Sequence, residues 1–197
     1  MPSAGGGGEG LRRSALAAVG AILDRLGIRW VVFGALAANL YRAETRFTQD
    51  LDLLLQDAGP GVAALEATLA ASGWKVRRAI PDGSMLRARH VEHGDVDLVV
   101  AETPYQREAL TRAREEILAD GTRVRALAIE DVVLHKLIAG RTRDLADVES
   151  ILDAALPMDE AYLERWAGEW EVLEPWRKLR AAARERRREQ PAKLEPH

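Results

Sequence analysis

The hydrophobic pattern changes character once along this chain, and that change sets the fold class. Up to residue 128, short apolar runs that fit strands alternate with stretches of helical periodicity, whereas every apolar pattern beyond Ile129 is helical. Short strands separated by turn residues and mixed with helices are typical of an α+β domain. The sequence therefore predicts an α+β domain over residues 10–128 and a C-terminal helical region over residues 129–190.

The turn residues indicate how the expected strands connect. Strands are expected at residues 28–33, 50–56, 74–80, 84–91, 95–101 and 122–128. Helices are expected at residues 11–26, from Gly34, at 62–72, at 105–118 and throughout the region after 129. The short PDG and HGD turns favour hairpins. We therefore expect a mixed β-sheet with flanking helices, followed by a helical bundle.

The two ends of the chain fall outside this pattern. Residues 1–9 are Gly-rich and lack an apolar core, so we expect a disordered tail rather than a signal peptide, and residues 191–197 form a second tail. No apolar run approaches the length of a membrane span, and the absence of cysteine excludes disulfides and thiolate metal sites. We expect a cytoplasmic protein with no membrane partner.

Two aspartates interrupt an apolar strand in the stretch RFTQDLDLLL. Asp50 and Asp52 are two residues apart, so a strand would point both carboxylates to the same face. Two like charges this close are disfavoured unless a cation lies between them. Oxygen ligands of this kind suit Mg²⁺, whose remaining positions are filled by water and phosphate.

A second Asp-x-Asp occurs in GDVDLVV, where Asp97 lies deeper in the apolar run than Asp95. If the two strands are neighbours, Asp50, Asp52 and Asp97 meet at one edge of the sheet. That arrangement predicts a site for two Mg²⁺ ions and phosphoryl transfer. The alternative is that these aspartates form turns or helix caps, as aspartates at strand ends often do.

Residues upstream of the first Asp-x-Asp add to this prediction. Gly34 marks a strand-to-helix junction, where backbone amides at a helix N-terminus could approach phosphate oxygens. Arg46 and Thr48 alternate with Asp50 and Asp52, so one extended segment would carry all four on one face. Arg46 could clamp phosphate or serve as a structural counter-ion of the carboxylates.

This segment resembles the nucleotidyltransferase superfamily related to DNA polymerase beta. That superfamily's signature is Gly-Gly or Gly-Ser, a helix, Asp-x-Asp on a strand and a later Asp. Here it is matched by Gly34-Ala35, by Asp50 and Asp52, and by Asp97. The resemblance is closest to AbiEii-type toxin nucleotidyltransferases, through RFTQDLDLLL and EDVVLHKLIAGRTRDLADV.

The resemblance implies further site residues and an activity. Lys136 would bind the nucleotide phosphates, and Arg143, Asp144 and Asp147 would support the active site. The implied reaction is Mg²⁺-dependent transfer of NMP from an NTP to a hydroxyl, such as a tRNA 3′ end or another RNA. A cognate antitoxin protein is an implied partner. We expect the active site to lie in a cleft between the two halves.

Two alternatives follow from departures within the matched motifs. The run TRFTQDLD is also similar to the Thr-Arg-x-His-x-Asp-x-Asp of small antibiotic nucleotidyltransferases, with Thr48 in place of His, and this similarity leaves a small-molecule acceptor as an alternative. Ala35 replaces the second Gly or Ser of the signature. This departure supports a second alternative, in which the chain is a non-catalytic, antitoxin-like binding module of the same fold.

Charge gives little support to broad nucleic-acid binding. The formal net charge is −3, so the whole chain is not a nucleic-acid-coating protein. Residues 177–189 carry a run of basic side chains that could grip RNA phosphates, but such a run is more typical of a solvated helix face.

Overall fold

The chain forms two compact units. The computed structural model describes residues 6–46, 48, 50–56 and 61–189. One unit takes the described parts of residues 1–40 and 46–128, and the other takes those of residues 41–45 and 129–197.

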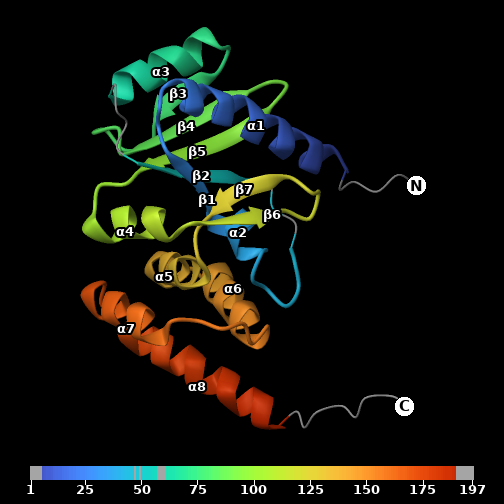
Figure 1. Cartoon of the computed structure of the whole chain (residues 1–197), viewed down its shortest axis with the longest axis vertical. Helices are drawn as coiled ribbons and strands as arrows, with labels where there is room; N and C mark the ends of the chain where they lie inside the picture. Colours follow the sequence, from blue (N-terminus) through green and yellow to red (C-terminus); the bar gives the residue numbers. More distant parts are fainter. Residues whose placement is uncertain (1–5, 47, 49, 57–60, 190–197) are drawn as a thin grey trace. The chain divides into compact units, whose positions relative to one another are not determined.

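A seven-stranded mixed sheet forms the centre of the first unit. Its strands are β1 (Trp30–Phe33), β2 (Leu51–Leu55), β3 (Lys75–Arg78), β4 (Met85–His90), β5 (Gly94–Val100), β6 (Arg114–Ile117) and β7 (Arg123–Ala126). The strand order is β3-β4-β5-β2-β1-β7-β6 (Figure 1). The pairs β2/β5 and β1/β7 are parallel, and β1/β2, β3/β4, β4/β5 and β6/β7 are antiparallel. The predicted α+β fold with a mixed sheet is confirmed.

Four helices accompany the sheet in the part of this unit that the structure describes. They are α1 (Gly6–Arg25), α2 (Gly34–Ala38), α3 (Val62–Ala71) and α4 (Pro104–Arg112). Helix α1 packs on β5 and β2 (Figure 1), and buried side chains such as Leu23, Leu53 and Leu98 form the core between them. Helix α1 begins within the Gly-rich segment that we expected to be a disordered tail.

The end of the expected helix over residues 105–118 also differs from the prediction. The expected helix over residues 105–118 ends at Arg112, and Arg114–Ile117 forms strand β6, which pairs with β7. The charged sequence REEI fits an edge strand, where charged side chains protect unpaired backbone groups. Its hydrogen bonds come from a partner strand that follows a turn, so local helical propensity did not decide its structure.

Helices alone make up the regular structure of the described part of the second unit. They are α5 (Ile129–Ala139), α6 (Thr142–Asp153), α7 (Glu160–Glu169) and α8 (Leu173–Glu189). Helix α5 packs on α6 and α7, and α8 packs on the same two helices. The side chain of Trp176 is fully buried in this bundle. No helix among the described residues is long and apolar enough to cross a membrane.

Candidate active site

Two aspartates face each other across neighbouring parallel strands. In the β2/β5 ladder Asp52 is the register partner of Asp97, so both side chains leave the sheet on the same face. The side chain of Asp97 is 15% exposed, and Asp52 is half-buried. Two carboxylates therefore lie side by side at a position that is partly open to solvent.

Asp50 lies just before this pair and outside the strand. Strand β2 begins at Leu51, and Asp50 is exposed. Thr48 is buried and, like Arg46, lies outside any strand, and the expected alternation of Arg46 and Thr48 with the two aspartates stays a prediction. The backbone of Arg46 is instead held by Asn39, whose side-chain amide donates to Arg46 O at 2.8 Å and accepts from Arg46 N at 3.2 Å. Residues 47 and 49 lie outside the described residues.

Gly34 lies directly against Asp52. Strand β1 ends at Phe33, which is the register partner of Asp52, and Gly34 turns the chain into α2 with φ +66°. A Cβ atom at Gly34 would lie 2.0 Å from Asp52 Oδ2. Glycine is therefore required at position 34 for two reasons: the backbone is left-handed, and the Asp52 carboxylate occupies the space that a side chain would take. Ala35 follows as a half-buried residue of α2.

A cation that the sequence analysis missed is paired with Asp97. Arg87 on β4 is the register partner of Asp97 on β5. Its Nε donates to Asp97 Oδ1 at 2.6 Å and its Nη2 donates to Asp97 Oδ2 at 2.5 Å. The pair is bidentate, which fixes the orientation of the carboxylate. Arg89 and Asp95 form the neighbouring pair of the same hairpin in the same way.

The acidic neighbours of Arg87 act on its pKa. Hydrogen bonding to Asp97 raises the pKa of Arg87 above its usual value, and the charges of Asp97, Asp50 and Asp95 add to this effect. Arg87 thus offsets the mutual repulsion of the carboxylates.

A second cluster of charges is buried in the helical unit. Lys136 on α5 is buried, and its Nζ lies 2.9 Å from Asp144 Oδ1 and 2.7 Å from Asp147 Oδ2 on α6. Arg141 donates to Asp144, and Arg42 donates to Asp147, each at 2.5 Å. Three cations therefore share two buried carboxylates.

The charged state of this second cluster is held by its hydrogen bonds. Burial raises the pKa of Asp144, but hydrogen bonds from Arg141 and Lys136 outweigh it and leave the pKa below its usual value. Arg143, in contrast, is exposed on α6. The sequence-predicted residues therefore fall into two groups, Gly34, Asp50, Asp52 and Asp97 in the sheet unit, and Lys136, Asp144 and Asp147 in the helical unit.

Residues 14–160 match the family model described as nucleotidyltransferase of unknown function (DUF6036). The chain belongs to this nucleotidyltransferase family. The match spans most of the chain and confirms the predicted membership in the nucleotidyltransferase superfamily and the predicted enzyme class. No curated protein matches the chain.

Solved structures support the fold of this nucleotidyltransferase. The antibiotic-resistance factor ANT(2″)-Ia is 17% identical, with a TM-score of 0.54, and the match covers 90% of this chain and 98% of that one. The lincosamide antibiotic adenylyltransferase LnuA is 13% identical, with a TM-score of 0.50 over 70% of this chain and 94% of that one. A nucleotidyltransferase from H. pylori is 17% identical, with a TM-score of 0.50 over 100% of both chains.

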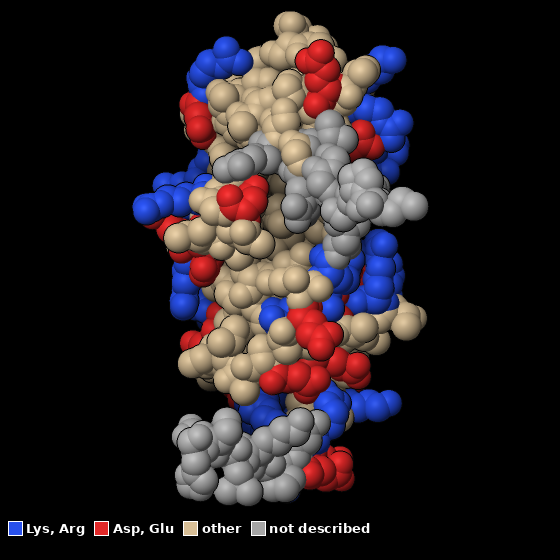
Figure 2. Space-filling view, turned by 90° about the vertical axis from the view of Figure 1, so that its right-hand side faces the viewer, with Lys and Arg blue, Asp and Glu red and all other residues tan. Residues whose placement is uncertain are grey.

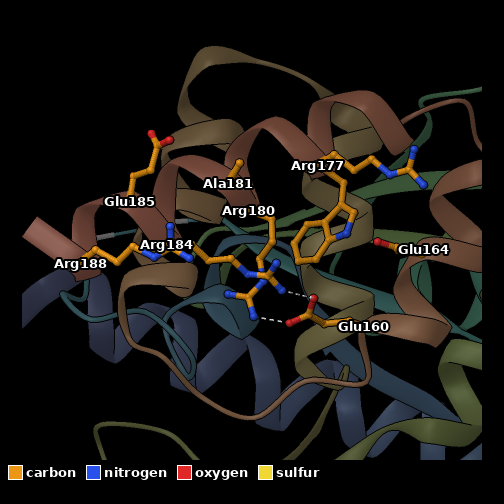
Figure 3. A pocket seen from close by; sticks show the side chains of 9 residues that line it. Glu160, Glu164, Arg177, Arg180, Ala181, Arg184, Glu185 and Arg188 are labelled. Atoms are coloured by element: carbon orange, nitrogen blue, oxygen red, sulfur yellow. Dashed lines mark hydrogen bonds and ion pairs between the residues drawn. The ribbon is translucent and has the colours of Figure 1, made fainter.

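Part of the positive charge on the C-terminal helix of the nucleotidyltransferase is paired with carboxylates of its own unit. Arg180 and Arg184 of α8 both donate to the carboxylate of Glu160 on α7, in a shallow pocket of about 260 Å³ (Figure 3). Arg186 donates to Asp153, and Arg187 donates to the carbonyl of Leu152, both at the end of α6. These four arginines therefore attach the helix to α6 and α7.

Figure 2 shows how charged side chains are distributed on one face of the molecule. Lys and Arg side chains are interspersed with Asp and Glu side chains on the visible face, and they do not form one continuous basic surface there. Dispersed charge of both signs produces no strong single-sign field toward a polyanion.

Proposed function

We propose that this nucleotidyltransferase transfers NMP from an NTP to a hydroxyl acceptor at the cluster of Asp50, Asp52 and Asp97. The direct register of Asp52 with Asp97 carries the proposal, because it places two oxygen donors side by side at a partly open position. The close approach of Gly34 supports it, since a Cβ atom there would displace the Asp52 carboxylate.

The donor set fits magnesium. Three carboxylates supply only oxygen ligands, which suits a small hard cation, and the predicted pair of Mg²⁺ ions would share them. When bound, Mg²⁺ supplies charge neutralisation of the triphosphate and acidifies the acceptor hydroxyl. Asp50, Asp52 and Asp97 would hold it.

The chain's own residues orient the reactants and manage the proton. Arg87 holds the Asp97 carboxylate by two hydrogen bonds, so its direction is set before substrate arrives. Asp97 would take the proton of the acceptor hydroxyl. The acceptor oxygen then bonds to the α-phosphorus while the bond from that phosphorus to the leaving pyrophosphate breaks. The roles of Arg46, Thr48, Lys136, Arg143 and Asp144 in nucleotide binding stay predictions.

We infer an RNA 3′ end, such as that of tRNA, as the first candidate acceptor. It is supported by the similarity of RFTQDLDLLL and EDVVLHKLIAGRTRDLADV to AbiEii-type toxins, and a cognate antitoxin and a cytoplasmic location belong to the same proposal. A small hydroxylated molecule is the second candidate. The intramolecular pairing of the α8 arginines favours it, and the full-length fold match to an antibiotic-resistance factor is consistent with it.

An acceptor assay separates the candidates. The purified chain and its Asp52→Asn variant are incubated with each α-labelled NTP, Mg²⁺ and either total tRNA or a panel of aminoglycosides and lincosamides. Label on RNA with the wild type alone supports the first candidate, and label on a small molecule supports the second. Absence of labelled product, together with absence of NTP binding by calorimetry, would reject the catalytic proposal.

A further inference from the structure

A histidine-rich turn closes the β4–β5 hairpin, next to the Arg89–Asp95 pair. His90 ends β4, Glu92 and His93 form the turn, and β5 begins at the next residue. Each of these three residues offers one ligand atom, and the three atoms lie within 4.8 Å of one another. The tight turn therefore gathers two imidazoles and a carboxylate at one point of the surface.

Packing holds both imidazole rings in place. The rings of His90 and His93 are stacked, with centroids 4.4 Å apart. Both also contact the ring of Trp74, at centroid distances of 5.2 Å and 5.8 Å, and Trp74 is only 3% exposed. The ring positions thus depend on a buried platform, so little ordering remains for a ligand to impose.

Hydrogen bonds select one nitrogen on each ring. The amide of Glu92 donates to His90 Nδ1 at 3.1 Å, so that nitrogen carries a lone pair and no proton in this arrangement. A Cβ atom at Gly73 would lie 3.0 Å from His90 Nε2, so the other side of the ring is closely packed. His93 Nδ1 lies 2.5 Å from Ser14 Oγ, which leaves His93 Nε2 as its metal-binding atom.

We propose that His90, Glu92 and His93 form a site for a zinc-like divalent transition metal. Two imidazole nitrogens and one carboxylate oxygen are a donor set that zinc uses, whereas magnesium prefers oxygen alone. The metal would replace the Glu92 amide as the partner of His90 Nδ1, and water would complete its coordination because Glu92 is exposed.

The site is separate from the aspartate cluster. His90 lies three residues along β4 from Arg87, or about 10 Å at the usual rise of a strand. Because the ligands close the hairpin and His93 contacts Ser14 of α1, metal binding would fasten this hairpin to the helix that covers the sheet. Zinc should therefore raise the thermal stability of the protein.

Zinc titration of the full chain without a histidine tag tests the proposal. The metal-stripped protein is returned to excess Mg²⁺, which fills the aspartate cluster, and is then titrated with Zn²⁺ by calorimetry, while Co²⁺ absorption reports nitrogen ligation. We expect one ion per chain and a loss of affinity of more than about tenfold in His90→Gln and in His93→Gln. Two control variants should bind zinc as the wild type does. His197→Gln makes the same chemical change outside the described residues, and Asp52→Asn changes the aspartate cluster.

Three results would overturn the proposal. One is wild-type zinc binding weaker than about 100 μM. Another is unchanged affinity in both histidine variants when circular dichroism shows them folded. If those variants do not fold, Glu92→Gln decides, because this exposed side chain can be changed without disturbing the Trp74 packing. Reduced affinity and a weaker Co²⁺ spectrum in Glu92→Gln then support the site, and wild-type behaviour rejects it.

Discussion

Arg87 donates one hydrogen bond to each carboxylate oxygen of Asp97 on the neighbouring strand, at 2.6 and 2.5 Å. The guanidinium of Arg87 binds the same carboxylate that we assign as a metal ligand. Arg87 and the metal ion must therefore either share the Asp97 carboxylate or replace one another there. Arg87 is 42% exposed, which leaves it free to move toward solvent or toward a phosphate when the metal enters. The pair therefore links metal affinity to substrate orientation.

Replacing Arg87 should separate these two effects. Arg87→Gln removes a positive charge next to the metal position, so we expect Mn²⁺ or Mg²⁺ affinity to rise by about tenfold. The rate of nucleotidyl transfer at saturating metal should fall, because Asp97 loses its fixed orientation. Arg89→Gln is the matched control, since Arg89 makes the equivalent pair with Asp95. Equal metal affinity in Arg87→Gln and the wild type would contradict the shared role.

Gly34 offers a test of the close approach to Asp52. Gly34→Ala should abolish activity, because its Cβ would lie 2.0 Å from Asp52 Oδ2. Gly27→Ala is the matched control, since Gly27 has nearly the same φ, +68°, and among the described residues no heavy atom beyond its chain neighbours lies within 4 Å of the position that its Cβ would take. Each change should cost about 1–2 kcal/mol of stability through the left-handed backbone. Activity per folded molecule, measured after thermal denaturation curves, should survive in Gly27→Ala alone.

Replacing Lys136 tests whether this residue has a structural role alone or also binds the nucleotide. Lys136→Met leaves two buried carboxylates short of one partner, so we expect the free energy of unfolding to fall by about 3 kcal/mol. The exposed Lys75 provides the control variant Lys75→Met, which should be near neutral. If Lys136 also binds the nucleotide, the KM for NTP rises at temperatures where the variant stays folded. An unchanged KM would remove Lys136 from the predicted nucleotide ligands.

His135 should make the helical unit sensitive to mild acid. Burial, helped by the charge of Lys136, lowers the pKa of His135 from 6.5 to about 4. The unfolded chain then binds more protons than the folded chain between these two pKa values, so stability falls as the pH drops from about 6.5 toward about 4. Urea denaturation should give a free energy of unfolding about 2 kcal/mol lower at pH 5 than at pH 7. His135→Gln should show much less of this loss.

The Asp52–Asp97 pairing shows what periodicity can predict. Asp52 and Asp97 each lie in an apolar run, with a second aspartate two residues before them. Charged residues are rare in buried strands, so this pattern indicates a functional site. The same reasoning could have found Arg87. In the stretch RARHVEHGDVD, a hairpin closed by His90 and Gly94 places Arg89 opposite Asp95 and Arg87 opposite Asp97.

Other features depended on contacts that local sequence does not encode. Lys136 could be placed on a helix, but its burial depends on two aspartates of α6 and on Arg42, which is 105 residues away from Asp147. Strand β6 exists because β7 pairs with it, and its charged residues favoured a helix when considered alone. Tertiary pairing overrode local propensity in β6, whereas at Lys136 it decided the burial of a residue whose helix was predicted correctly.

The most direct test of the central claim compares two aspartates of β5. Initial rates of pyrophosphate release are measured with NTP, Mg²⁺ and the acceptor identified by labelling, for the wild type, Asp97→Asn and Asp95→Asn. We predict that Asp97→Asn loses more than about a hundredfold in rate, since even outer-shell partners of metals contribute about 10- to 100-fold. Asp95→Asn should keep most of the activity, because Asp95 pairs with Arg89 at the exposed end of the hairpin. Equal rates in the two folded variants would contradict an active site built on Asp52 and Asp97.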